Sequence, residues 1–235
     1  PNESSAASDV YKRQAMDYSQ IELRLMAHYS KDQIMLDSFK NNEDIHKRTA
    51  SEVFSVEMEN VTDEMRRRAK TINFGLLYGM SAFGLSNQLS VSRAEAEEFL
   101  LNYFAKYSSI KIFMKDVVEQ AKKDKYVSTL YGRKVHVPNI ESPNYMLRQA
   151  SERAAVNGPL QGSAADIIKR AMINIFKESG KNEKDVKMIL QVHDELVFEV
   201  PEDYDEKNIS YLIDLMEESS SIDVPLKVEY GFGSN

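Results

Sequence analysis

The 235-residue chain is 42% hydrophobic, contains no cysteine and carries a formal net charge of −7. This composition suffices for a buried core in one large or two small domains, and it excludes a disulfide framework and a thiolate metal site. No apolar run approaches the roughly 18 residues that a membrane-spanning helix needs, so we expect a soluble, cytoplasmic protein without a membrane partner.

The distribution of charge matters more than its sum for the choice of partner. Acidic residues concentrate between Glu199 and Glu218, whereas basic residues cluster at 66–70 and again at 122–134. A negative net charge argues against a nucleic-acid partner, because phosphate binding depends on basic surface. A chain that is acidic overall can still present one basic cleft, so nucleic-acid binding stays open at this point.

The N-terminal stretch, residues 1–14, is polar and shows neither a helical nor a strand period, which indicates a disordered or non-native leader. From Ile21 onward the apolar residues have helical spacing. Asp17 lies just before this helix, where either a strand ends or a helix is capped, and Glu22 falls in the first turn.

A second helix is predicted over residues 42–54. Asp44 is placed to cap its N-terminus, and His46 then falls in the first turn. A single histidine in that position is more often a surface residue than a ligand. His46 gains functional meaning only if it faces the same cleft as the basic helix that follows.

That basic helix, residues 62–80, is the most distinctive helix of the sequence. Thr62 is a suitable N-cap, and one face is apolar. A second face carries a residue of interest at every fourth position: Arg66, Lys70, Phe74 and Tyr78. Such a stripe suits a polyphosphate at its basic end and a base or sugar at its aromatic end, although periodicity alone slightly favours an ordinary solvated face. Gly75 and Gly79 predict a close backbone approach, a bend or the end of the helix.

The middle of the chain is less informative. Residues 92–125 continue as a long helical pattern without a functional signal. Two short alternating segments, 126–130 and 134–137, predict a hairpin whose turn presents Arg133. An arginine in such a turn is as often a plain surface residue as a binding residue.

A further helix is predicted over residues 145–177, and the Gly158-Pro159 pair predicts a kink or break within it. Polar donors recur along this helix at three- and four-residue steps: Arg148, Gln149, Arg153, Asn157 and Gln161. Such a stripe suits contact with a nucleic-acid backbone or minor groove, but it is equally often solvated.

Near the C-terminus, residues 188–200 predict two apolar strands around the polar break His193-Asp194-Glu195. Two adjacent carboxylates at the tip of an apolar hairpin cost free energy unless a cation, most simply a divalent metal, neutralises them. Turn statistics alone favour an ordinary solvated turn. An acidic helix over 205–219 and a strand over 224–230 close the chain.

Three segments together resemble family A DNA polymerases. Asp17-Tyr18-Ser19-Gln20-Ile21-Glu22-Leu23-Arg24 resembles motif A, Arg66-x-x-x-Lys70-x-x-x-Phe74-x-x-x-Tyr78-Gly79 resembles motif B, and Gln191-Val192-His193-Asp194-Glu195 resembles motif C. The resemblance implies an α+β right-hand fold with mostly helical fingers and an antiparallel palm sheet. Residues 15–22 would then be the motif A strand of the palm, 23–130 the fingers, and 131–235 the palm with the motif C hairpin.

The reaction implied by this resemblance is template-directed DNA synthesis, in which a deoxynucleotide passes from a dNTP to a primer 3′-hydroxyl with release of pyrophosphate. Asp17 and Asp194 would hold two Mg²⁺ ions, with Glu195 as an accessory catalytic acid. His46, Arg66 and Lys70 would bind the triphosphate, and Lys70 would also donate a proton to pyrophosphate.

The resemblance also implies contacts to the sugar, the base and the DNA. Phe74 would pack on the nucleotide, and Tyr78 and Glu22 would crowd the ribose 2′ position. Gln20 would lie with the nucleotide. Contacts to primer–template DNA would come from four residues: Arg133, Asn157, Gln161 and His193.

Two departures from the family shape the remaining expectations. Residues 12–16 replace the apolar strand that precedes the motif A aspartate in relatives, and a thumb, the rest of the palm and exonuclease domains are missing. We therefore expect a monomeric fragment that does not polymerise efficiently alone. A nucleic-acid-binding fragment without catalysis and a metal-dependent phosphohydrolase remain as alternative functions.

Overall fold

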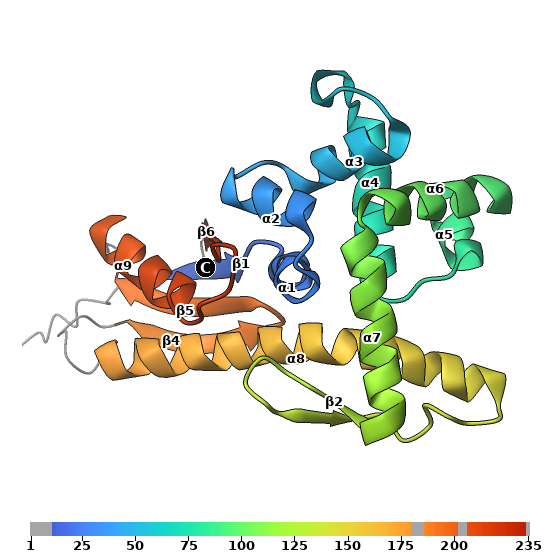
Figure 1. Cartoon of the computed structure of the whole chain (residues 1–235). Helices are drawn as coiled ribbons and strands as arrows, with labels where there is room; N and C mark the ends of the chain where they lie inside the picture. The colour runs from blue at the N-terminus through green and yellow to red at the C-terminus, as the bar shows by residue number, and fades with distance from the viewer. Residues whose placement is uncertain (1–10, 180–185, 202–205, 234–235) are drawn as a thin grey trace, which may run out of the picture. The chain divides into compact units, whose positions relative to one another are not determined.

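The computed structural model (Figure 1) describes residues 11–179, 186–201 and 206–233. These residues divide into two compact units. Unit 1 takes its described residues from 1–21, 167–221 and 226–235, and unit 2 consists of 22–166 and 222–225. Helices and antiparallel strands both contribute, so the predicted α+β class is confirmed. In the part of the chain that is described, no helix is long and apolar enough to cross a membrane.

Unit 1 is built on a four-stranded antiparallel sheet with the strand order β4-β5-β1-β6. The strands are β1 (Tyr11–Tyr18), β4 (Lys187–Val192), β5 (Glu195–Pro201) and β6 (Val228–Gly233). Alternate side chains of β1 and β5 are buried, because successive residues of a strand point to opposite faces. The two central strands therefore have one buried face and one more open face.

Helix α9 (Glu206–Glu217) lies beside this sheet in Figure 1 and packs on its buried face. The Tyr18 hydroxyl donates a 2.7 Å hydrogen bond to the carbonyl oxygen of Met216 in α9. Met16 and its register partner Leu196 lie on the same face as Tyr18 and are fully buried. Asp17 lies between Met16 and Tyr18 in β1, so it points to the opposite, more open face.

Gln14 is the exception on the buried face of β1. Its register partners are Phe198 in β5 and Phe232 in β6, and its side chain is fully buried. Neither its amide oxygen nor its amide nitrogen has a hydrogen-bond partner among the described residues. Burying an amide without partners costs free energy, so Gln14 weakens the strand that carries Asp17.

Unit 2 is mainly helical, and two of its helices begin directly after the predicted caps Asp44 and Thr62. They are α1 (Ile21–Ser30), α2 (Gln33–Lys40), α3 (Ile45–Phe54), the short 3-10 helix η1 (Met58–Asn60), α4 (Asp63–Leu77), α5 (Ala82–Leu89), α6 (Arg93–Lys106) and α7 (Ser108–Asp124). The Asp44 carboxylate accepts hydrogen bonds from the first turn of α3, and the Thr62 hydroxyl does so for α4. Helix α4 ends before Gly79, whose φ is +65°.

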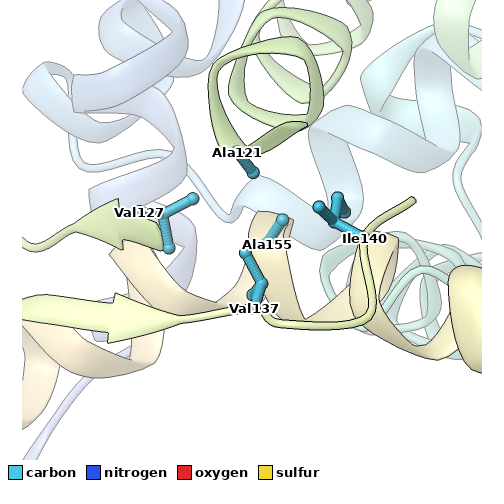
Figure 2. Close-up of a cluster of buried hydrophobic side chains, with 5 residues drawn as sticks. All are labelled: Ala121, Val127, Val137, Ile140 and Ala155. Atoms are coloured by element: carbon cyan, nitrogen blue, oxygen red, sulfur yellow. The ribbon is translucent and has the colours of Figure 1, made fainter. Parts of the chain in front are cut away.

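A hairpin of β2 (Tyr126–Ser128) and β3 (Lys134–His136) follows α7 and precedes α8 (Tyr145–Ser179). Figure 2 shows the buried cluster that joins these elements: Ala121, Val127, Val137, Ile140 and Ala155. This packing keeps the hairpin and the first part of α8 with the helical unit, which extends to residue 166. The expected boundary between fingers and palm at residue 130 stays a prediction.

Helix α8 continues through Gly158 and Pro159, so of the predicted kink or break the break is wrong. A Cβ at Gly158 would lie 2.7 Å from Val127 Cγ2, which means that the missing side chain lets the β2–β3 hairpin approach the helix closely. Pro159 is buried. Tertiary packing of this kind offsets the cost of about 3 kcal/mol that proline imposes on a helix interior.

Three predicted boundaries also change. Strand β1 starts at Tyr11, so residues 11–14 belong to the sheet rather than to a leader, because they pair with β5 and β6; residues 1–10 lie outside the described ranges. The long helix predicted over 92–125 divides at the buried residue Tyr107. The last strand lies at 228–233 instead of 224–230.

We expect the substitution Gln14→Leu to raise the free energy of unfolding by about 1–3 kcal/mol, because it replaces two buried polar groups without partners by an apolar side chain of similar size. Urea denaturation measures the change. Gln88→Leu, at an exposed position of α5, is the matched control and should change stability by less than about 0.5 kcal/mol. An unchanged or lower stability of the Gln14 variant would contradict the prediction.

Candidate active site

Three carboxylates from adjacent strands meet in unit 1. The register places Asp17 of β1 directly opposite Glu195 of β5 on one side and Glu229 of β6 on the other. We call these three residues the carboxylate row. Like charges on directly opposed strand residues destabilise a sheet, so this arrangement costs free energy in the absence of a cation.

The electrostatic cost is visible at Asp17. Burial, followed by the negative charges of Asp194, Glu195 and Glu229, raises the pKa of Asp17 from 3.8 to about 6, although the Tyr18 amide acts in the opposite direction. Asp17 Oδ1 is buried and has no hydrogen-bond partner among the described residues. Apart from the Tyr18 amide, the charged form of Asp17 therefore lacks the compensation that buried carboxylates normally have.

Asp194 is held close to this row by the hairpin turn between β4 and β5. The preceding residue, His193, is exposed and has a left-handed φ of 53°. The Tyr18 amide donates a 3.3 Å hydrogen bond to the carbonyl oxygen of Asp194, which ties the turn to the residue after Asp17. The predicted hairpin and its acidic tip are therefore confirmed as structure.

The donor atoms of this region fit a hard divalent cation such as Mg²⁺. Carboxylate oxygens are its preferred protein ligands, and the unpartnered Oδ1 of Asp17 leaves one such oxygen free to accept it. Within the described ranges, no group of three or more histidine, aspartate or glutamate side chains is placed to hold one ion. Asp17 and Asp194 would thus need oxygen ligands from substrate or water as well.

The basic and aromatic stripe predicted on α4 lies in unit 2. Ala69, Ile72 and Leu76 occupy the buried face of the helix, whereas Lys70 is exposed and Tyr78 is 42% exposed. Tyr78 is the C-cap of α4. The two predicted faces of the helix are therefore confirmed.

Arg66, at the basic end of this stripe, is oriented by an ion pair. Its Nε donates a 2.6 Å hydrogen bond to Asp44 Oδ2. Burial alone would raise the pKa of Asp44, but the hydrogen bond from Arg66 and those from the Lys47 and His46 amides outweigh it and hold that pKa below its ordinary value. Asp44 therefore caps α3 and fixes the direction of Arg66 at the same time.

His46 is buried, not a surface residue. Its ring lies 5.7 Å from the Phe74 ring, centroid to centroid, and its Nδ1 lies 3.1 Å from Asn73 Nδ2. Burial lowers the pKa of His46 to about 4; the charges of Arg66 and Lys70 act in the same direction and that of Asp44 in the opposite one. His46 is therefore neutral near pH 7.

The residues predicted to contact DNA from unit 2 lie on α8 and on the hairpin that packs against it. Asn157 and Gln161 are one turn apart on α8, and Gln161 is exposed. Arg133 donates from Nε to Asp166 Oδ1 and from Nη2 to the Gly162 carbonyl oxygen, both at 2.8 Å. Arg133 is therefore attached to α8 instead of standing free at the turn.

The two remaining predicted residues lie between β1 and the first turn of α1. Gln20 has a left-handed φ of 56° in the connection, and Glu22 falls in the first turn of α1. The capping role considered for Asp17 is wrong, because Asp17 is the penultimate residue of strand β1.

Sequence reasoning missed two residues. Glu229 fell inside a predicted strand, but nothing in the sequence indicates which strand it pairs with. Asn73 had a usable signal, since it shares the helical face of Ala69, Ile72 and Leu76, where a polar residue indicates a buried hydrogen bond.

Comparison with known proteins gives one consistent result. DNA polymerase I of Pseudomonas aeruginosa is 50% identical over 228 residues, which are 96% of this chain and 25% of that protein. DNA polymerase I of Bacillus subtilis is 45% identical over 219 residues, which are 93% of this chain and 25% of that protein. The chain thus spans about a quarter of the length of these curated relatives.

A solved structure agrees with these relatives. The POL domain of Pol1 from M. smegmatis, in complex with DNA primer-template and dNTP, superposes with a TM-score of 0.91 and 43% sequence identity, covering 96% of this chain and 40% of that one. The profile of DNA polymerase family A matches residues 5–235. The chain therefore belongs to DNA polymerase family A.

Proposed function

We propose that the chain carries out the nucleotidyl-transfer chemistry of template-directed DNA synthesis, joining a deoxynucleotide from a dNTP to a primer 3′-hydroxyl and releasing pyrophosphate. The observation that carries this proposal is the carboxylate row, in which Asp17 is held with an unpartnered oxygen between two strand-paired acids. Membership of DNA polymerase family A and the primer-template and dNTP of the M. smegmatis complex support the choice of substrates.

Asp17 and Asp194 are the residues that would hold the two Mg²⁺ ions, and Glu195 is an accessory acid beside them. Bound Mg²⁺ would favour deprotonation of the 3′-hydroxyl and offset the charge of the phosphoryl group and the pyrophosphate. The strand register fixes the backbone of Asp17, and the Tyr18 amide fixes that of the Asp194 turn. The backbone positions of both acids are thus set before any ligand binds.

We assign binding of the triphosphate to the basic end of α4. Arg66 presents a guanidinium whose direction the Asp44 carboxylate sets, and Lys70, one turn further, presents an exposed ammonium. Lys70 is also the proton donor that we assign to pyrophosphate. His46, neutral near pH 7, adds a hydrogen-bond donor without adding charge.

We assign contact with the sugar and base of the nucleotide to the aromatic end of the same helix. Phe74 is half-buried against His46, so it offers one side of its ring for packing on the nucleotide. Tyr78, together with Glu22 of α1, would crowd the ribose 2′ position, and Gln20 would contact the nucleotide. DNA would be contacted by Arg133, Asn157 and Gln161 in unit 2 and by His193 in unit 1.

Two other activities are outcomes that experiment can separate from synthesis. Binding of primer–template DNA without extension would indicate a catalytically incomplete fragment. Release of phosphate from a dNTP without DNA would indicate a phosphohydrolase, although hydrolysis has no need of the aromatic end of α4. The monomeric state and the cytoplasmic location stay predictions.

The substitution Asp194→Asn should abolish Mg²⁺-dependent extension of a labelled primer, a loss of at least about 100-fold, because it removes one metal-holding carboxylate. Asp214→Asn, on the exposed side of α9 in the same unit, removes an equal charge and should leave extension unchanged. Undiminished extension by the Asp194 variant, with its circular dichroism unaltered, would remove Asp194 from the mechanism.

The pH dependence of stability gives a test that needs no activity. An acid whose pKa is raised on folding contributes stability below pH 3.8, and this contribution is lost as the pH rises to about 6. Asp17→Asn should therefore raise the free energy of unfolding at pH 8 without metal, by on the order of 1 kcal/mol for a partly exposed carboxyl. The gain should vanish near pH 4, and saturating Mg²⁺ should reduce it at pH 8 by stabilising the unsubstituted chain. A gain that is independent of pH would contradict the electrostatic cause.

A further inference from the structure

A chain of buried polar side chains runs behind the nucleotide-facing residues of unit 2. Asn73 Nδ2 lies 3.1 Å from His46 Nδ1 and 3.0 Å from Thr49 Oγ1, and the Thr49 hydroxyl lies 3.2 Å from Asn73 Oδ1. Thr49 Oγ1 is also 3.3 Å from the Tyr107 hydroxyl. These four residues, which we call the polar chain, are all buried, and they connect α3 and α4 with the start of α7.

The hydrogen-bonding capacity of Asn73 decides the protonation of His46. The amide nitrogen carries two hydrogens and accepts none, and its two neighbours are Thr49 Oγ1 and His46 Nδ1. In this orientation both amide hydrogens have an acceptor. If the amide group were rotated by half a turn, so that its oxygen faced His46, one buried amide hydrogen would lack an acceptor, which costs free energy. His46 Nδ1 is therefore the acceptor, and the ring proton is on Nε2.

We propose that Asn73 is a positioning residue for His46, which it holds in the Nε2–H tautomer so that α3 offers the nucleotide phosphates a neutral N–H donor of fixed direction. This inference rests on the proposed function, in which His46 binds the triphosphate. His46 keeps only 2% of its surface exposed. Because the Asn73 amide occupies Nδ1, Nε2 is the ring nitrogen that remains for a ligand.

A neutral donor suits this place because positive charge is already present. Arg66 and Lys70 both act on the His46 ring, and Asp44 is the opposing charge. A third cation beside Arg66 and Lys70 would be repelled by them. Arg66 and Lys70 therefore attract phosphate by their charge, whereas His46, oriented by Asn73, donates a hydrogen bond of fixed direction.

The decisive measurement is the ¹⁵N spectrum of the His46 ring in the whole chain, without nucleotide. The chain has four histidines, so loss of one set of signals in His46→Gln assigns the ring. We expect a protonated Nε2 and an unprotonated Nδ1 at pH 7. In Asn73→Leu the preference for this tautomer should disappear. Asn102→Leu removes another asparagine amide of unit 2, one that donates to the Val53 carbonyl oxygen, and should leave the His46 spectrum unchanged.

Nucleotide binding gives the second readout. The dissociation constant for dATP should rise about tenfold in Asn73→Leu, as expected for the loss of one well-directed hydrogen bond to a charged group, and remain unchanged in Asn102→Leu. Thr49→Val, which removes one acceptor of the Asn73 amide, should shift the tautomer preference in the same direction. Thr49→Val replaces Asn73→Leu as the test variant if Asn73→Leu does not fold.

The outcomes distinguish failure of the role of Asn73 from failure of the nucleotide-binding role of His46. A protonated Nδ1 in the unsubstituted chain, or an unchanged tautomer in folded Asn73→Leu, overturns the role of Asn73. The expected tautomer together with a His46 spectrum that saturating dATP does not change overturns the nucleotide-binding role of His46, and with it the part of the proposed function that assigns the triphosphate to α3.

Discussion

The pairing of β1 between β5 and β6 is the constraint on which the candidate site depends. A shift of one residue would turn Met16 and Tyr18 out of the core, so burial of these side chains fixes the register. The same register places Asp17 opposite two glutamates. Packing of the buried face thus holds like charges together on the other face. The fold tolerates this repulsion, and a divalent cation would relieve it.

In helix α4, too, the packing of one face determines which residues the other face presents. Its apolar face is buried through Ala69 and Ile72, which turns the stripe containing Lys70 and Phe74 outward. Asn73 lies on the buried face of α4, and its amide contacts His46. It thus links the core of unit 2 to His46, whose ring lies beside Phe74 of the stripe. The orientation of His46, one of the residues proposed to bind the nucleotide, is therefore set by a buried side chain of the core.

Much of this could be predicted from the sequence, because local rules govern it. Caps such as Thr62, the acidic hairpin tip at Asp194 and the two faces of α4 all follow from residue type and spacing. Contacts between distant segments could not be predicted in this way. Glu229 becomes a neighbour of Asp17 only through strand pairing, and Pro159 remains helical only because a hairpin packs on α8. The roles of the motif residues in binding and catalysis stay predictions.

The most direct test of the central claim is to titrate the ¹⁵N-labelled chain with Mn²⁺, a paramagnetic substitute for Mg²⁺, and to follow the backbone amide signals. A cation held at the carboxylate row and Asp194 should broaden the signals of Tyr18, Glu195 and Glu229 first, at Mn²⁺ concentrations that leave α9 unaffected. Competition by excess Mg²⁺ should restore them. Broadening that begins at the acidic residues of α9, with the row unchanged, would contradict the claim that the sheet register builds a cation site.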